Sequence, residues 1–334
     1  MTDFSVLDLV PVREGSGISE AIRDAGRLAQ VAEEAGYKRF WVAEHHASLG
    51  IAGGPTAVVL SHIGHVTSTI RIGSGGIMLP NHNPFVIAEQ FGALEALFPG
   101  RVDLGLGRAP GSAPIIGQAL RKDLHRAAEY FPQDVVELRA LLTGDLDLPI
   151  TATPGMGANV ELWMLGSSLF GAQLAARLGL PYAFASHFAP RHLDEALAVY
   201  RSEFRPSAAL ERPHVMAAMG VLCAQTDAEA QYLASSQDQA FVALRSGDPG
   251  KLPPPVRDYR ESLPPQSRMM LEGMDEARAV GSPETVRRKI EAFVRRTQAE
   301  EIIFAGATHD PEARMHSLRL TMEALAHYPQ TSFS

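Results

Sequence analysis

The 334-residue sequence contains a single cysteine, Cys223. One thiol excludes an intramolecular disulfide and a cysteine-rich metal site. Because Cys223 lies in the apolar run 220–224, we expect it to be a buried structural residue. The sequence also lacks a basic tail or a basic run, and its formal net charge is −8 at pH 7. This acidic balance argues against binding to nucleic acid or to an anionic membrane surface.

Long apolar segments are also missing. No apolar run reaches the ~18 residues that are needed to cross a bilayer. The N-terminus enters a strand pattern directly, without a basic stretch followed by an apolar signal core. We therefore expect a cytoplasmic protein.

The sequence instead shows short apolar strands that alternate with longer amphipathic segments almost from end to end. The predicted strands are 4–10, 40–43, 70–73, 102–106, 162–165, 182–185, 215–221 and 302–305. The predicted helices are 18–35, 55–66, 84–97, 126–142, 169–178, 193–204, 228–240, 283–297 and 311–326. Eight strands with intervening helices predict an α/β fold, a (β/α)8 TIM barrel that takes up residues 1–334 as a single domain.

One stretch does not fit this alternation. Residues 246–281 contain six prolines and show little helical or strand periodicity at their start. A loop of this length in a compact domain is usually functional or disordered. We expect either a mobile lid or interface segment, or an inert insertion before the last helix–strand unit.

Polar side chains follow the second predicted strand, where Glu44, His45 and His46 come directly after the apolar residues 40–43. Ligands bind at the carboxyl ends of parallel strands, and histidine exchanges its proton near neutral pH. Consecutive strand residues point to opposite faces, so both histidines enter the barrel only if the chain bends. No metal site is predicted, because adjacent histidines chelate one ion poorly and no third ligand is recognisable.

Glycines follow the third and fourth predicted strands. Those in residues 73–80 allow the backbone to approach a flat ligand closely, although an ordinary turn explains them equally well. Residues 103–112 resemble a dinucleotide-binding fingerprint but fail it, because Pro110 stands where the third glycine belongs.

A phosphate site is indicated by Arg108, whose guanidinium can bind such a group bidentately. Ser167 and Ser168 precede a predicted helix, where they serve as N-caps, as an anion site, or as both. Closure of the barrel is expected to bring Arg108 and the two serines together as halves of one phosphate clamp.

Several of these segments form an ordered set that covers nearly the whole chain. They are 41–46 (WVAEHH), 75–80 (GGIMLP), 100–108 (GRVDLGLGR), 165–168 (LGSS), 179–181 (GLP) and 280–284 (VGSPE). Together they closely resemble the bacterial luciferase-like, flavin-dependent monooxygenases. The resemblance implies a (β/α)8 barrel and a homodimer. It also implies reduced FMN as co-substrate, delivered by a separate NAD(P)H:flavin reductase, with O2 forming a flavin peroxide that oxidises a small organic substrate.

The resemblance further implies catalytic roles for residues of this chain. His45 matches the catalytic histidine of the family, with Glu44 and His46 in support. The non-proline cis peptide that supports the flavin ring in the family would match Gly75–Gly76 or the bond next to it.

The cofactor phosphate is assigned in the same way. Arg108 matches the phosphate-binding arginine of the family, and Ser167, Ser168 and Gly171 match its phosphate-binding serine region.

The sequence departs from the true luciferases at two places. Ala113 and Pro114 stand where luciferases have an acidic residue, and Ser186 and His187 stand where they have a tryptophan. We therefore expect a non-luminescent member of the family, with His187 near the substrate.

The sequence thus predicts an FMN-dependent, two-component monooxygenase with an unidentified substrate. The alternatives are a deazaflavin-dependent hydride-transfer oxidoreductase of the same superfamily and a non-catalytic flavin-binding protein. No lysine stands at the predicted strand ends, which disfavours a Schiff-base barrel enzyme.

Overall fold

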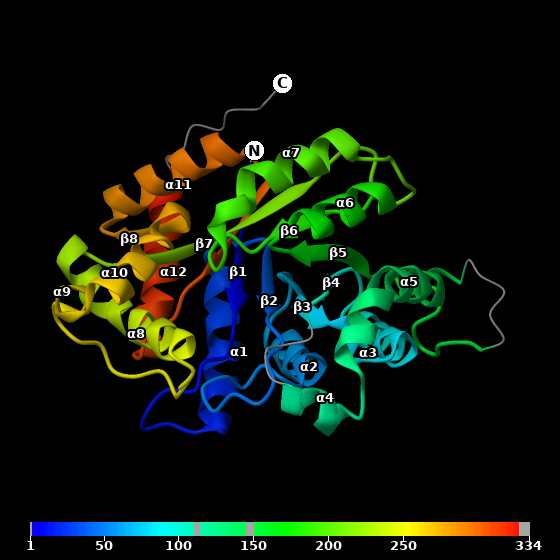
Figure 1. The fold of residues 1–334 in the computed structure, drawn as a ribbon, viewed down its shortest axis with the longest axis horizontal. Helices are drawn as coiled ribbons and strands as arrows, with labels where there is room; N and C mark the ends of the chain where they lie inside the picture. The colour runs from blue at the N-terminus through cyan, green and yellow to red at the C-terminus, as the bar shows by residue number, and fades with distance from the viewer. Residues whose placement is uncertain (1, 110–113, 145–149, 327–334) are drawn as a thin grey trace.

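Eight parallel strands form a closed barrel in the computed structural model, which describes residues 2–109, 114–144 and 150–326 (Figure 1). Around the ring they are β6 (Tyr182–Phe184), β5 (Glu161–Gly166), β4 (Val102–Gly107), β3 (Arg71–Met78), β2 (Arg39–Val42), β1 (Asp3–Asp8), β9 (Glu301–Ala305) and β7 (Val215–Cys223). Pairing of β6 with β7 closes the ring. The predicted TIM barrel is confirmed, and each of its strands overlaps one of the eight predicted segments.

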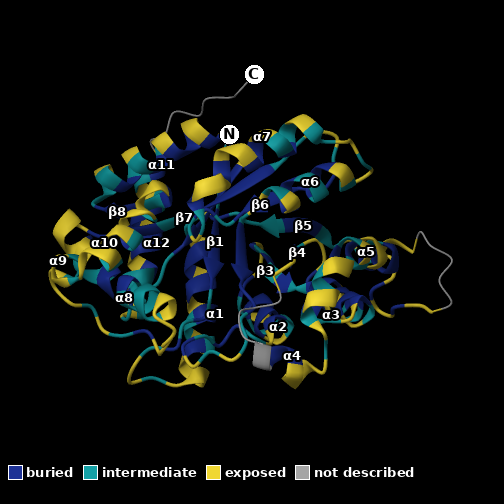
Figure 2. Ribbon diagram, in the orientation of Figure 1, coloured by how far each residue is buried: buried dark blue, intermediate teal, exposed yellow. Residues whose placement is uncertain are grey.

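Helices surround the strands, and their buried faces point toward the barrel (Figures 1 and 2). They are α1 (Ile18–Glu34), α2 (Thr56–Val66), α3 (Pro84–Leu97), α4 (Pro114–Leu120), α5 (Leu124–Thr143), α6 (Leu169–Leu178), α7 (Leu193–Glu203), α8 (Asp227–Arg245), α9 (Tyr259–Ser262), α10 (Pro265–Glu272), α11 (Pro283–Thr297) and α12 (Pro311–Leu325). Short 3-10 helices are η1 (Leu79–Asn81), η2 (Pro190–His192) and η3 (Asp275–Ala277). Within the described residues no helix is both long and apolar enough to cross a membrane.

Local sequence explains where several helices begin and end. Asn83 caps α3 by accepting a hydrogen bond from the Phe85 amide, 2.9 Å away. Gly179 ends α6 in the left-handed conformation, at a φ of 62°, which lets its amide donate back to the last turn. The prediction missed α4, α9 and α10, which are short.

The proline-rich segment 246–281 contains structure that its sequence did not predict. It includes α9, α10, η3 and the strand β8 (Arg278–Gly281), which pairs with residues 220–223 at the end of β7. Leu252 is buried and exchanges backbone hydrogen bonds with Val12 and Glu14 of the β1–α1 loop. The segment is therefore attached to the first loop of the barrel, while its role as a lid stays a prediction.

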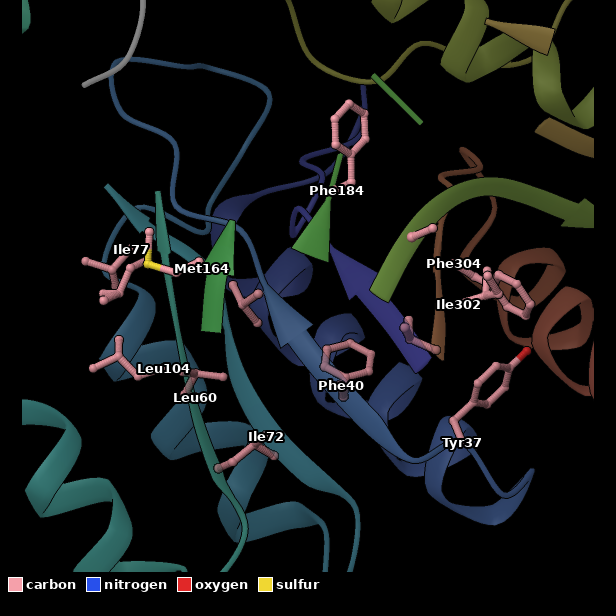
Figure 3. Packing of buried hydrophobic residues seen from close by; sticks show 14 of the residues in the cluster. Tyr37, Phe40, Leu60, Ile72, Ile77, Leu104, Met164, Phe184, Ile302 and Phe304 are labelled. Atoms are coloured by element: carbon pink, nitrogen blue, oxygen red, sulfur yellow. The ribbon is translucent and has the colours of Figure 1, made fainter. Parts of the chain in front are cut away.

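The core has two layers because strand side chains alternate between the two faces of the sheet. The larger layer lies between the strands and the helices, and Figure 3 shows part of it, with Phe40, Ile72 and Leu104 of the strands and Leu60 of α2. A smaller apolar cluster fills the barrel itself. At its centre the rings of Trp41 and Trp163 pack edge to face, with centroids 5.3 Å apart.

An ion-pair network closes the barrel at the amino ends of its strands. The Arg39 side chain, 2% exposed, donates to Glu301 at 2.9 Å, to Asp103 at 2.8 Å and to Glu161 at 3.2 Å. Arg39 also lies over the Trp163 ring, 4.8 Å from its centroid. Burial by itself raises the pKa of Glu301, but hydrogen bonding and the charge of Arg39 outweigh burial and lower it to about 2. The network and the two tryptophans therefore fill this end of the barrel, which leaves the carboxyl end for a ligand.

We expect Arg39→Ala to lower the free energy of unfolding by about 3–5 kcal/mol, because Asp103 and Glu301 would remain buried without their shared cation. Urea unfolding followed by circular dichroism measures the change.

The matched control is Arg296→Ala, which removes an exposed ion pair with Asp194 and should cost less than about 1 kcal/mol. Equal losses in the two variants would contradict a special role for the buried network.

Candidate functional site

Glu44 is a buried carboxylate just beyond β2, and its side chain joins two strand ends. One oxygen, Oε1, accepts hydrogen bonds from Nε2 of His46 at 2.5 Å and from Nε2 of His82 at 2.8 Å. The other, Oε2, accepts the amide of Met78 at 2.9 Å. Burial alone raises the pKa of Glu44, but the bonds and charge of His82, together with Met78 and His46, outweigh burial and lower it. Glu44 is therefore held ionised between the ends of β2 and β3.

No role for His82 was predicted from the sequence. Its partner Glu44 is 38 residues away in the chain, and only the parallel pairing of β2 with β3 brings the two together. Lys122 holds His82 from the other side by donating a hydrogen bond to its carbonyl oxygen. The one sequence signal for His82 is that a polar residue follows a strand end that is rich in glycine and proline.

His45 and His46 make different contacts, as expected for consecutive residues near a strand end. His46 bonds to Glu44, whereas Nδ1 of His45 is buried and has no hydrogen-bond partner among the described residues. The pKa of His45 is lowered, chiefly because burial penalises the charged imidazolium; the charge of Glu44 opposes this effect and His46 adds to it. A neutral imidazole with a free nitrogen is suited to exchange a proton with a bound molecule.

His187 provides a second imidazole near His45. It follows β6, and the preceding Ser186 fixes the chain by donating from Oγ to the carbonyl of Ala218 at 2.5 Å. Nδ1 of His187 is also buried without a partner in the described part of the chain. Burial, with a smaller contribution from the charge of His45, lowers the pKa of His187 to about 4. Both rings are therefore neutral at pH 7 and retain unused hydrogen-bonding capacity.

The Gly75–Gly76 peptide bond is cis, as the family resemblance predicts. It lies where the pairing of β3 with β4 shifts register, between Ser74 and Ile77. Glycine is also required across this pair of strands, because a Cβ on Gly105 would lie 2.3 Å from the Ser74 carbonyl oxygen. At Gly75 and Gly76 the strand β3 thus has no side chains of its own.

Arg108 and the start of α6 lie side by side, as the predicted phosphate clamp requires. Gly107 and Leu165 are paired across β4 and β5, and the Arg108 guanidinium lies 4.2 Å from the ring centroid of Phe170 in the first turn of α6. Ser168 is the N-cap residue of α6, but its side chain makes no capping hydrogen bond. The first-turn amides, next to an exposed arginine, form a suitable anion site.

The rest of this region is only partly described. Gly171 is buried in α6, and Gly166 lies beside it: a Cβ on Gly166 would be 3.6 Å from the Gly171 Cα. Pro110 and Ala113, on which two of the sequence comparisons depend, lie outside the described residues.

Comparison with known proteins extends over nearly the whole chain. The family model described as luciferase-like monooxygenase matches residues 2–300. A luciferase-like monooxygenase of Escherichia coli (strain K12) is 45% identical over 328 residues, 97% of this chain and 98% of that protein. The N-acetyl-S-alkylcysteine monooxygenase of Bacillus subtilis (strain 168) is 34% identical over 254 residues, 74% of this chain and 75% of that protein.

Solved structures share the fold. The crystal structure of apo-MsnO8 is similar with a TM-score of 0.87 and 35% identity, over 99% of this chain and 100% of that one. The oxygenating constituent of 3,6-diketocamphane monooxygenase from Pseudomonas putida, in complex with FMN, is similar with a TM-score of 0.71 and 17% identity, over 99% of this chain and 100% of that one. An F420-dependent secondary alcohol dehydrogenase is similar with a TM-score of 0.67 and 15% identity, over 97% of this chain and 98% of that one. The last two show the fold alone.

We expect His187→Phe to raise the free energy of unfolding by about 1 kcal/mol, because it removes a buried nitrogen without a partner while keeping a planar ring. Thermal and urea unfolding measure the effect. The control is Tyr200→Phe, which removes a hydroxyl that donates to the Leu180 carbonyl at 2.9 Å and should destabilise the protein. Destabilisation by both variants would contradict the prediction that the His187 nitrogen lacks a hydrogen-bond partner.

Proposed function

The chain belongs to the luciferase-like monooxygenase family, and we propose that this flavin-dependent monooxygenase uses reduced FMN and O2 to oxidise a small organic molecule. We further propose that a separate NAD(P)H:flavin reductase supplies the reduced FMN and that the enzyme acts as a homodimer. One observation carries the choice of a phosphorylated flavin. An uncapped helix terminus with an exposed arginine lies at the same end of the barrel as a buried imidazole that has a free nitrogen.

The residues present fit a phosphorylated flavin at both of its ends. Arg108 and the first-turn amides of α6 would hold the phosphate, with Ser167, Ser168 and Gly171 around it. The side-chain-free backbone at Gly75–Gly76 would lie against the flat ring system. When bound, reduced flavin supplies the electrons and the oxygen-activating chemistry that no side chain has.

The proposed proton chemistry belongs to His45. Its buried Nδ1 would take up or release a proton at the reacting atoms, and the lowered pKa keeps the ring neutral and able to act as a base. Glu44 and His46 are positioning residues, because their mutual hydrogen bond fixes the chain on both sides of His45. The apolar cluster inside the barrel, with Trp41 and Trp163, excludes water from the floor below the site.

His187 is proposed to contact the substrate. It stands where the luciferases have a tryptophan, and it offers a neutral hydrogen-bonding nitrogen in place of an apolar ring. This difference supports a polar substrate and a reaction without light emission. Because one relative from Bacillus subtilis is an N-acetyl-S-alkylcysteine monooxygenase, N-acetyl-S-alkylcysteines are the first substrates to test.

Two alternatives remain testable beside this proposal. The fold is shared with an F420-dependent dehydrogenase. If the cofactor of this protein is a deazaflavin, the protein should bind F420 tightly and have no affinity for FMN. The non-catalytic reading predicts flavin binding without substrate oxidation. Spectral titration of the purified protein with each reduced cofactor, under anaerobic conditions, distinguishes the first alternative from our proposal.

We expect Arg108→Ala to weaken FMN binding roughly 10- to 100-fold and to leave riboflavin binding nearly unchanged, because only FMN carries the phosphate. Anaerobic titration with the two reduced flavins measures both affinities. Arg126→Ala is the matched control, since Arg126 also lies over an aromatic ring, that of Tyr130, but outside the proposed site. An equal loss of FMN and riboflavin binding would contradict the phosphate assignment.

We expect His45→Ala to lower substrate-dependent oxygen uptake roughly 100-fold or more while it leaves FMN affinity nearly unchanged. Oxygen uptake with reduced FMN, measured against a panel that begins with N-acetyl-S-alkylcysteines, tests this expectation. Equal substrate-dependent rates in wild type and variant would remove His45 from the chemistry.

A further inference from the structure

Glu44, His46 and His82 bring three potential metal-ligand atoms to one point. The carboxylate oxygen and the two ring nitrogens all lie within 4.8 Å of one another. Across residues 2–109, 114–144 and 150–326, this is the one group of three histidine, cysteine or acidic residues that converges so closely. His82 is the third ligand that the sequence alone did not reveal.

The geometry is fixed from two sides. Glu44 lies two residues beyond β2, and its second oxygen is held at 2.9 Å by the amide of Met78, at the end of β3. His82 follows η1, and its carbonyl oxygen is held by Lys122. The three side chains therefore come from two separately anchored segments, an arrangement that does not require the chain to fold around an ion.

The charge at this point also favours a cation. The Glu44 side chain has no solvent-exposed surface, and within the described residues its ion-pair partners are His46 and His82 alone. A buried carboxylate needs compensating positive charge. A divalent ion supplies that charge directly, in place of the protons that now lie between Oε1 and the two Nε2 atoms.

The donor set indicates which ions fit. Two imidazole nitrogens with one carboxylate oxygen are typical ligands of Zn²⁺ and of other first-row divalent ions, whereas Mg²⁺ and Ca²⁺ prefer oxygen ligands throughout. Ligand bonds of about 2.1 Å at tetrahedral angles require the N and O atoms to lie about 3.4 Å apart. The present N···O distances are 2.5 and 2.8 Å, and both rings are partly exposed, 27% each, so each ring can move outward by the remaining distance of less than about 1 Å.

We propose that Glu44, His46 and His82 bind one divalent transition-metal ion, Zn²⁺ or an ion of similar chemistry, through Oε1 and the two Nε2 atoms. The ion would tie the residues after β2 to those after β3 and so hold the segment that carries His45. The site stands on the geometry of the three side chains, so it is independent of which flavin or substrate the enzyme uses.

Co²⁺ is the probe that tests this site, because its visible absorption reports coordination by nitrogen and oxygen ligands. Full-length protein is treated with EDTA, dialysed and titrated with Co²⁺ in the absence of flavin. We expect one ion per chain, displacement by Zn²⁺, and no competition by Mg²⁺. We also expect a rise in the melting temperature, since the ion binds the folded state.

His46→Ala and His82→Ala should each weaken Co²⁺ binding roughly tenfold or more, because each removes a ligand. His65→Ala is the matched control: His65 is exposed on α2 and its Nδ1 bonds to the Ser61 carbonyl, so its loss should leave Co²⁺ binding unchanged. Circular dichroism checks that every variant is folded, and His82→Gln replaces His82→Ala if the latter is not.

Two results would overturn the proposal. One is the absence of Co²⁺ bands and of bound zinc in folded wild-type protein. The other is stoichiometric Co²⁺ binding that persists in a folded variant without both His46 and His82. Either result leaves the flavin assignment untouched, because flavin binding is measured separately.

Discussion

The barrel depends on one buried cation. Arg39, the first residue of β2, bonds to carboxylates at the amino ends of β4, β5 and β9, so one side chain connects four of the eight strands. Asp103 and Glu301 are fully buried, so removing the cation would leave two negative charges in an apolar environment. Closure of this end by charge and by the two tryptophans confines any ligand to the opposite end.

Buried polar side chains lie at both ends of the barrel. At the amino end Asp103 is bonded to Arg39, Arg71 and the Trp41 indole. At the carboxyl end, nitrogens of His45 and His187 are buried without partners in the described structure. Unsatisfied buried groups cost stability, and the two imidazoles at the carboxyl end lie where a bound ligand would supply the missing hydrogen bonds.

The sequence alone predicted the eight strands of the ring, but it did not predict the side-chain contacts of the site. The eight barrel strands were predictable because each is a short apolar run between helical patterns. β8 was not, since it is four residues long and follows a proline-rich stretch. Glu44 and His45 were found because they directly follow a buried strand. His82 was missed, because its importance arises from a neighbouring strand 38 residues away, and the contact of Arg108 with Phe170 required the pairing of β4 with β5.

The long strand β7 pairs both with strands of the ring and with a strand outside the ring. Residues 215–220 pair with β6 and β9 within the ring, and residues 220–223 pair with β8 outside the ring. Residues 246–281 consequently contribute no hydrogen bond between strands of the closed barrel. A change of length within this segment would therefore leave every strand pairing of the closed ring in place, so the rim and the ring are separate parts of the hydrogen-bonding scheme.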